Sequence, residues 1–162
     1  MREAQRLLSG GLAIGYAGGS VRKGVDRGGF KVETSHVELE EGTYHDEWAA
    51  DRLGGGQELV RTRDGEIFTR LYAGGTISQE ELRRLRISKK MVTDYLKGKL
   101  SELKDATRLD RYCLPKPDGY WQYRYELTGI NFREIPVKVG IETISFKGQL
   151  VFAHFFLLSP VE

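Results

Sequence analysis

Residues 121–128 read Trp-Gln-Tyr-Arg-Tyr-Glu-Leu-Thr, so large apolar side chains alternate with polar ones. Successive side chains of a β-strand point to opposite faces of its sheet. The alternation therefore predicts a strand with one buried face and one face in water, which is typical of antiparallel sheets. This segment is the clearest strand of the chain, and the rest of the fold is built outward from it.

Two hairpins are predicted on either side of tight turns. Residues 140–146 and 149–157 flank Lys147-Gly148, while residues 57–63 and 66–72 flank Asp64-Gly65. Such turns need a positive φ, which glycine adopts without strain. Residues 149–157 are apolar on both faces, so we expect them to form a central strand.

The N-terminal part is divided by glycines. We expect a short helix that ends at Ser9-Gly10-Gly11, and a mobile Gly-rich surface loop at residues 18–29. Phosphate binding by that loop is the alternative, although no Gly-Lys-Ser/Thr and no helix pattern follow it. The helix is expected at 2–8 and strands at 12–16, 30–39 and 43–50, the last ended by Gly54-Gly55-Gly56.

The middle of the chain carries the strongest helical pattern. Ser78-Gln79-Glu80-Glu81 is a capping box, which typically begins a helix. The pattern predicts either one long helix, kinked near Ile87, or two helices with Ser88 capping the second. Its apolar face consists of Leu82, Leu85, Val92, Leu96 and Leu103.

The two halves resemble each other, since each has a helical segment followed by strands, a glycine break and a hairpin. We interpret residues 1–162 as one domain with pseudo-repeats at about 2–77 and 78–158. The alternative, that any two β-meanders look alike, stays open. The predicted fold class is α+β: a curved, mostly antiparallel sheet of six to eight strands, with one long helix, kinked or straight, packed on it.

Composition excludes several functional classes. A net charge of +2, with acids interleaved among the bases, does not indicate a nucleic-acid partner. The longest apolar stretch, 150–158, is far shorter than the ~20 residues of a membrane-spanning helix. The first residues lack the apolar core of a signal peptide, and a lone Cys113 cannot form an internal disulfide, so we expect a cytoplasmic protein.

The chain contains three short glycine-based motifs, Tyr16-Ala17-Gly18-Gly19, Gly42-Thr43-Tyr44-His45-Asp46 and Gly56-Gln57-Glu58. These motifs resemble those of an uncharacterised domain family of bacteria and archaea, a domain of unknown function. Some members carry a helix-turn-helix ahead of this domain and look like transcription regulators, so the resemblance implies a prokaryotic ligand-sensing or docking domain. The family pattern has two glycines after its aromatic residue, whereas Trp48 is followed by Ala49-Ala50 here. The resemblance supplies no mechanism.

Catalytic and metal-binding signatures are weak. His36, His45 and His154 show no metal-ligand spacing, and His45 and Asp46 are adjacent on a predicted strand, so they point to opposite faces. We therefore predict no metal and no cofactor. Cys113 has no nearby histidine to activate it.

The candidate site is a groove between the two meanders. Phe68, Arg70 and Tyr72 share one strand face, and an arginine between two aromatic residues must reach either solvent or an acid. A buried structural ion pair is the alternative interpretation, and the aromatic set would also fit a core. The predicted ligand-binding residues are Tyr44, Asp46, Glu58, Arg70, Tyr72, Trp121, Tyr123 and His154.

Two functions follow from these residues. The first is a non-enzymatic module that binds a small molecule or a protein partner, with a homo-oligomer left open. The second is a small hydrolase or lyase that uses Asp46, Glu58 and His154. Whether the protein is an enzyme is left undecided by the sequence.

Overall fold

A computed structural model of the chain describes residues 2–19, 22–49, 53–107, 112–132 and 135–160. Within these ranges one antiparallel sheet of nine strands has the order β1-β2-β3-β4-β5-β9-β8-β7-β6. The strands are β1 (Arg22–Arg27), β2 (Phe30–Leu39), β3 (Gly42–Trp48), β4 (Leu53–Thr62), β5 (Ile67–Thr76), β6 (Tyr112–Cys113), β7 (Trp121–Phe132), β8 (Ile135–Phe146) and β9 (Gln149–Pro160).

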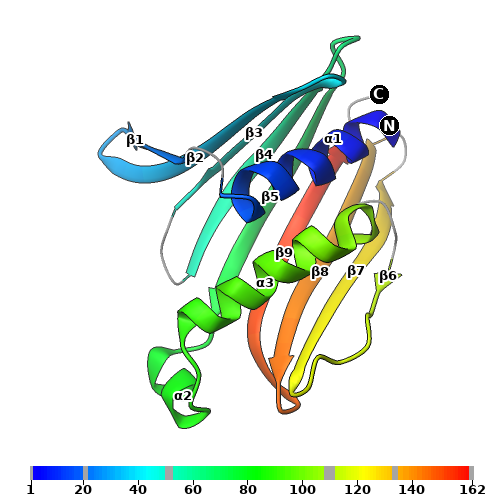
Figure 1. Cartoon of the computed structure of the whole chain (residues 1–162). Helices are drawn as coiled ribbons and strands as arrows, with labels where there is room; N and C mark the ends of the chain where they lie inside the picture. Colours follow the sequence, from blue (N-terminus) through cyan, green and yellow to red (C-terminus); the bar gives the residue numbers. More distant parts are fainter. Residues whose placement is uncertain (1, 20–21, 50–52, 108–111, 133–134, 161–162) are drawn as a thin grey trace.

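Helices cover one face of this sheet. α1 (Arg2–Leu12) continues into a π-helical turn, Ala13–Ala17, and contacts β3 and β4. α3 (Lys89–Leu103) ends in a short 3₁₀ turn, Lys104–Thr107, and lies beside α1 across the strands (Figure 1). α2 (Gln79–Arg84) leads from β5 to α3.

The predicted fold class was wrong. Over the described residues the chain is 28% helical and 54% strand, with nine strands rather than six to eight. The described residues form no single long helix: the alternative of two helices, α2 and α3, is the one found, since Arg86 has a φ of 58° and Ser88 caps α3 through its side chain. The class is therefore a mostly-β sheet with three short helices, although its antiparallel pairing agrees with the prediction.

Glycine was misread in the N-terminal half. The predicted loop at 18–29 contains β1, because Gly28 and Gly29, with φ of 61° and 90°, form the turn between β1 and β2. A Gly-Gly pair is itself a hairpin signal.

The predicted helix end at Ser9-Gly10-Gly11 and strand at 12–16 are also wrong. A β-carbon on Gly11 would lie 2.1 Å from Cγ of Tyr44, and one on Gly15 would lie 2.5 Å from Oγ of Ser35. These glycines let the helical segment approach the sheet closely, which outweighs their low helix propensity.

Gly54-Gly55-Gly56 does not end a strand but forms part of β4. A β-carbon on Gly56 would lie 2.5 Å from the hydroxyl oxygen of Tyr72 on the neighbouring strand. Gly55 and Gly56 are therefore required by the close approach of the neighbouring strands β3 and β5.

Both predicted hairpin turns are confirmed. Gly65 has a φ of 86° and Gly148 a φ of 77°. β9 lies between β5 and β8, so its predicted central position is also confirmed. The two meanders, β1–β5 and β6–β9, meet through the β5–β9 pair, whereas their origin by duplication stays a prediction.

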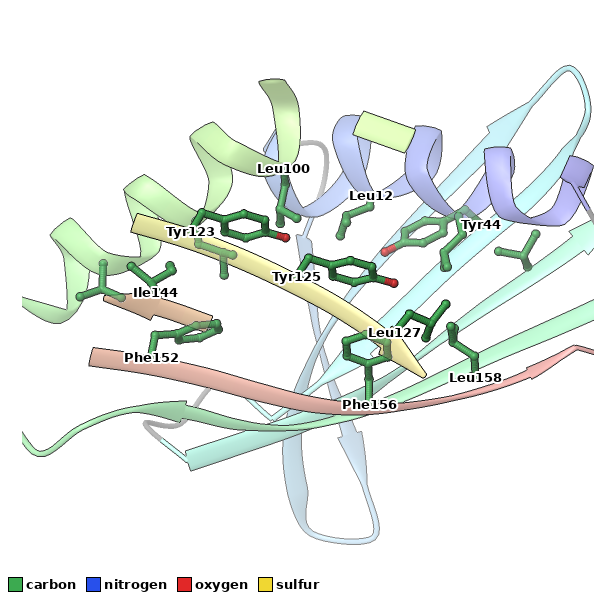
Figure 2. Close-up of a cluster of buried hydrophobic side chains, with 14 of the residues drawn as sticks. Leu12, Tyr44, Leu100, Tyr123, Tyr125, Leu127, Ile144, Phe152, Phe156 and Leu158 are labelled. Carbon is green, nitrogen blue, oxygen red and sulfur yellow. The ribbon is translucent and has the colours of Figure 1, made fainter. Parts of the chain in front are cut away.

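The core lies between the inner sheet face and the helices. Figure 2 shows Leu12 and Leu100 of the two helices above Tyr44, Tyr123, Tyr125 and Phe156 of the sheet. None of the helices in the described ranges has the length and apolar character needed to cross a membrane.

Candidate functional site

Three charged side chains lie side by side on the inner face of the sheet. The cross-strand register pairs Asp46 of β3 with Glu58 of β4, and Glu58 with Arg70 of β5. All three residues are buried, with exposed fractions of 2%, 1% and 3%. Buried charges are costly unless they are paired, so each of these three side chains needs a hydrogen-bond or ion-pair partner from the protein or from a ligand.

Glu58 is held by two donors. The hydroxyl group of Tyr44 donates to Oε1 at 3.0 Å, and Nη1 of Arg70 donates to Oε2 at 2.5 Å. Burial raises the pKa of Tyr44, and the nearby charges of Glu58 and Asp46 raise it further, so this tyrosine stays a protonated donor. Glu58 therefore serves as the ion-pair partner of Arg70.

Arg70 stacks on an aromatic ring. Its guanidinium carbon lies 4.4 Å from the ring centre of Phe156 and 5.5 Å from that of Tyr72. Burial alone would lower the pKa of Arg70, but the charges of Glu58 and Glu142 outweigh it and raise the pKa, so the group stays charged. Its Nε and Nη2 atoms are buried and have no hydrogen-bond partner among the residues that the structure describes.

The ring of Phe156 is fixed by its surroundings. It stacks on Tyr125 with 5.3 Å between ring centres and 12° between planes. On β8, a β-carbon at Gly140 would lie 2.1 Å from Cζ of Phe156, so only glycine leaves room for the ring. The position of Arg70 is thus set by residues from both meanders.

A second acid and hydroxyl pair lies beside Arg70. The hydroxyl group of Tyr72 donates to Oδ1 of Asp46 at 2.9 Å. Burial raises the pKa of Tyr72, and the charges of Asp46 and Glu58 act in the same direction. At neutral pH Tyr72 is therefore a hydrogen-bond donor and not a base.

The C-terminal meander contributes a third buried carboxylate. Glu142 accepts a hydrogen bond from the hydroxyl group of Tyr123 at 2.6 Å, and Nδ1 of His154 lies 4.0 Å from its Oε2. The His154 ring is 5.3 Å from that of Tyr72 and 4.4 Å from that of Phe152, centre to centre. His154 thus connects the two halves of the site.

A cavity of about 250 Å³ lies between the sheet and α3, and its lining includes Asp46, Glu58, Arg70, Tyr72, Glu142 and His154. Gly54 and Gly74 are directly paired across β4 and β5 and both line it. Gly74 has a φ of 143°, and a β-carbon there would lie 2.0 Å from the backbone oxygen of Ala153 on β9, so this lining position has no room for a side chain. Aromatic and charged side chains from the helical segments and the sheet complete the lining: Tyr16, Glu33, Trp48, Lys89, Thr93, Lys97 and Phe152.

The predicted site residues divide into three groups. Asp46, Glu58, Arg70, Tyr72 and His154 line the cavity. The predicted Tyr44 and Tyr123 lie behind it as buried donors to Glu58 and Glu142. The predicted Trp121 lies outside it, 5.0 Å from the Tyr95 ring and 4.6 Å from the Phe146 ring, and belongs to the core.

Glu142 and Lys97 are among the charged lining residues that the sequence-based site prediction did not include. Glu142 lies near the start of the predicted strand before Lys147-Gly148, as Glu58 lies near the start of the one before Asp64-Gly65, and this correspondence is the signal that could have identified it. Lys97 lies on α3, with its ammonium nitrogen 4.9 Å from the Tyr16 ring centre. No pattern in the sequence indicates which turn of the helix faces the cavity.

Within the described ranges, no cluster of three or more His, Cys, Asp and Glu side chains is arranged to hold a metal ion. No protein-family model, no curated protein and no solved structure matches this chain. The cavity itself combines a stacked arginine, a protonated tyrosine, carboxylates and aromatic walls.

Proposed function

We propose that this chain is a binding module for a small polar organic molecule, which occupies the cavity beneath α3. The observation that carries the proposal is Arg70: a side chain only 3% exposed lines the cavity, and two of its donor nitrogens have no partner within the described ranges. An unmade hydrogen bond to a buried charged group is costly. A ligand acceptor placed against these nitrogens would recover that free energy.

The surroundings suit recognition. Aromatic rings supply an apolar wall, and a few fixed polar groups supply orientation, which is the usual composition of small-molecule sites. Arg70 is preorganised by Phe156 and Glu58, so a ligand would not have to order it.

A second candidate, a hydrolase or lyase, is favoured by one observation. Asp46, Glu142 and His154 line the same cavity, and general acid–base chemistry uses such groups. Glu58 is less suited to proton transfer because Arg70 and Tyr44 already bind both of its oxygens. Hydrolysis or elimination in a bound ligand, detected by mass spectrometry, would favour this candidate.

Filling the cavity tests the binding proposal. Thr93 of α3 lines the cavity and is half-buried, so Thr93→Trp should occupy it. Met91 of the same helix is 45% exposed, and Met91→Trp is the matched control. A library of small polar compounds is screened by thermal shift and confirmed by calorimetry.

We expect at least one compound to raise the melting temperature of the parent protein and of Met91→Trp but not of Thr93→Trp. The proposal is wrong if no compound binds the parent, or if Thr93→Trp binds its ligands as tightly as the parent does.

A further inference from the structure

We propose that the ligand is a small aminocarboxylate, whose carboxylate binds the unpaired edge of Arg70 and whose ammonium group lies among the carboxylates of the cavity. This inference rests on the proposed binding function and names the class of its ligand.

The carboxylate half follows from the geometry of Arg70. Nη1, which lies on the Cδ side of the guanidinium, binds Glu58, so the remaining Nε and Nη2 donate from one common edge. Two parallel N–H groups on one edge match the two oxygens of a carboxylate. Stacking on Phe156 holds this edge in a fixed plane.

The ammonium half follows from the charges around that edge. Described residues of the lining include the acids Glu33, Asp46, Glu58 and Glu142, and the bases Arg70, Lys89 and Lys97, with His154 as a further titratable group. The acids are concentrated at the buried end, where Asp46, Glu58 and Glu142 are each at most 2% exposed. A plain anion at Arg70 would be repelled by these acids, and a plain cation would be repelled by Arg70. A molecule that carries one negative and one positive group can place the negative group at Arg70 and the positive group near the carboxylates.

The same balance argues against a phosphate ester. A phosphate carries about −1.5 to −2 at neutral pH, which would add more negative charge to a lining that already holds four carboxylates. A carboxylate adds a single negative charge, and the ammonium group compensates it.

Size limits the rest of the molecule. A cavity of about 250 Å³ lies just below the range of ~300–1,000 Å³ usual for ligand sites, so the ligand is small. Trp48, Tyr72 and Phe152 provide flat apolar surface for a side chain.

The test compares matched probes. The panel consists of the L-amino acids, β-alanine and 4-aminobutanoate. Each compound is tested together with two analogues, the amine that lacks its carboxylate and the acid that lacks its amino group. One such set is L-phenylalanine, 2-phenylethylamine and 3-phenylpropanoate. Affinities are measured by calorimetry on the full chain. We expect at least one aminocarboxylate to bind, and both of its analogues to bind at least about tenfold more weakly, since each lost charged contact is worth that much or more.

Variants then test which residues bind the carboxylate and which bind the ammonium group of the ligand. Arg70→Lys keeps a cation for Glu58 but removes the two-donor edge, so binding should weaken at least tenfold. Glu142→Gln should reduce the preference for the aminocarboxylate over its deaminated analogue, a ratio that a mere loss of stability does not change. Lys99→Met, a buried lysine outside the cavity lining, is the control and should bind as the parent does.

The outcomes separate the two proposals. If the compound screen finds a ligand that Thr93→Trp excludes, but no aminocarboxylate binds or the analogues bind equally well, the ligand class is wrong and the binding function stands. If nothing in the screen or the panel binds, both are wrong.

Discussion

The guanidinium carbon of Arg70 lies 4.4 Å from the ring centre of Phe156, although the two residues come from strands of different meanders. Arg70 also binds Glu58 on its own meander, and Phe156 stacks on Tyr125. The Arg70–Glu58 ion pair of the site and the Phe156–Tyr125 stack of the core therefore pack directly against each other. A change to either is expected to alter both stability and binding.

Gly140→Ala tests the space behind Phe156. The added β-carbon would lie 2.1 Å from Cζ of the ring, so the ring must move or the strand must shift. We expect a loss of about 1–3 kcal/mol, as for other overpacked cores, measured by urea denaturation. Gly98→Ala on α3 is the matched control: nothing lies within 4 Å of its β-carbon, and the change should stabilise the helix. Equal effects of the two substitutions would contradict this packing.

The Arg70–Glu58 pair should show strong coupling. Arg70→Met leaves a buried carboxylate and Glu58→Gln leaves a buried cation, so each should cost about 3–5 kcal/mol. The double variant should cost much less than the sum. Arg27 and Glu47 form an exposed ion pair on the opposite sheet face, with side chains 57% and 28% exposed, and the same cycle there should give a much smaller coupling because water screens the pair. Additive effects at Arg70 and Glu58 would refute the pairing in solution.

The turn at Gly65 is testable because its φ is 86°. Gly65→Val should destabilise by about 1 kcal/mol or more, since a β-branched residue is strained at positive φ. Gly65→Asn should cost less, because asparagine tolerates this region better. Thermal melting of both variants measures the difference, and equal melting temperatures would show that the turn relaxes.

The sequence was sufficient for the local elements of the sheet. Alternation in 121–128 and the turns at Gly65 and Gly148 depend on neighbouring residues only, and these predictions were correct. The roles of Gly11, Gly56 and Gly140 depend on contacts with residues far away in the chain, which no local pattern contains. Arg70 and its acids were predicted from strand faces. Trp121 lies outside the cavity lining, and the sequence could not show this because alternation indicates a face of the sheet but not a position along it.

His45 predicts a pH effect on stability. Burial lowers the pKa of His45, and the charge of His36 lowers it further, with Arg27 acting in the same direction and Glu47 opposing. A histidine whose folded pKa lies below its unfolded value binds protons more readily when unfolded. Stability is therefore unaffected well above pH ~6.5 and falls as the pH drops below it. Urea denaturation at pH 7.5 and 5.0 should show a smaller loss for His45→Gln than for the parent, and an identical loss would contradict the assignment.

Lys99 tests whether a buried lysine acts through its charge or through its stem. It is 5% exposed, and its ammonium nitrogen lies 2.7 Å from Glu102 and 2.9 Å from Asp118. The two acids are 59% and 63% exposed, so water competes for these ion pairs, which are then worth about 1 kcal/mol or less. The four-carbon stem is buried whatever the charge.

Lys99→Met keeps the stem volume and should change the unfolding free energy by about 1 kcal/mol at most, whereas Lys99→Ala should cost about 2 kcal/mol or more. Urea denaturation at 0.05 and 1 M salt separates the contributions, since only the ion pairs weaken with salt. If Lys99→Met costs as much as Lys99→Ala, and the cost disappears at high salt, the ion pairs and not the stem hold α3 to the loop that carries Asp118.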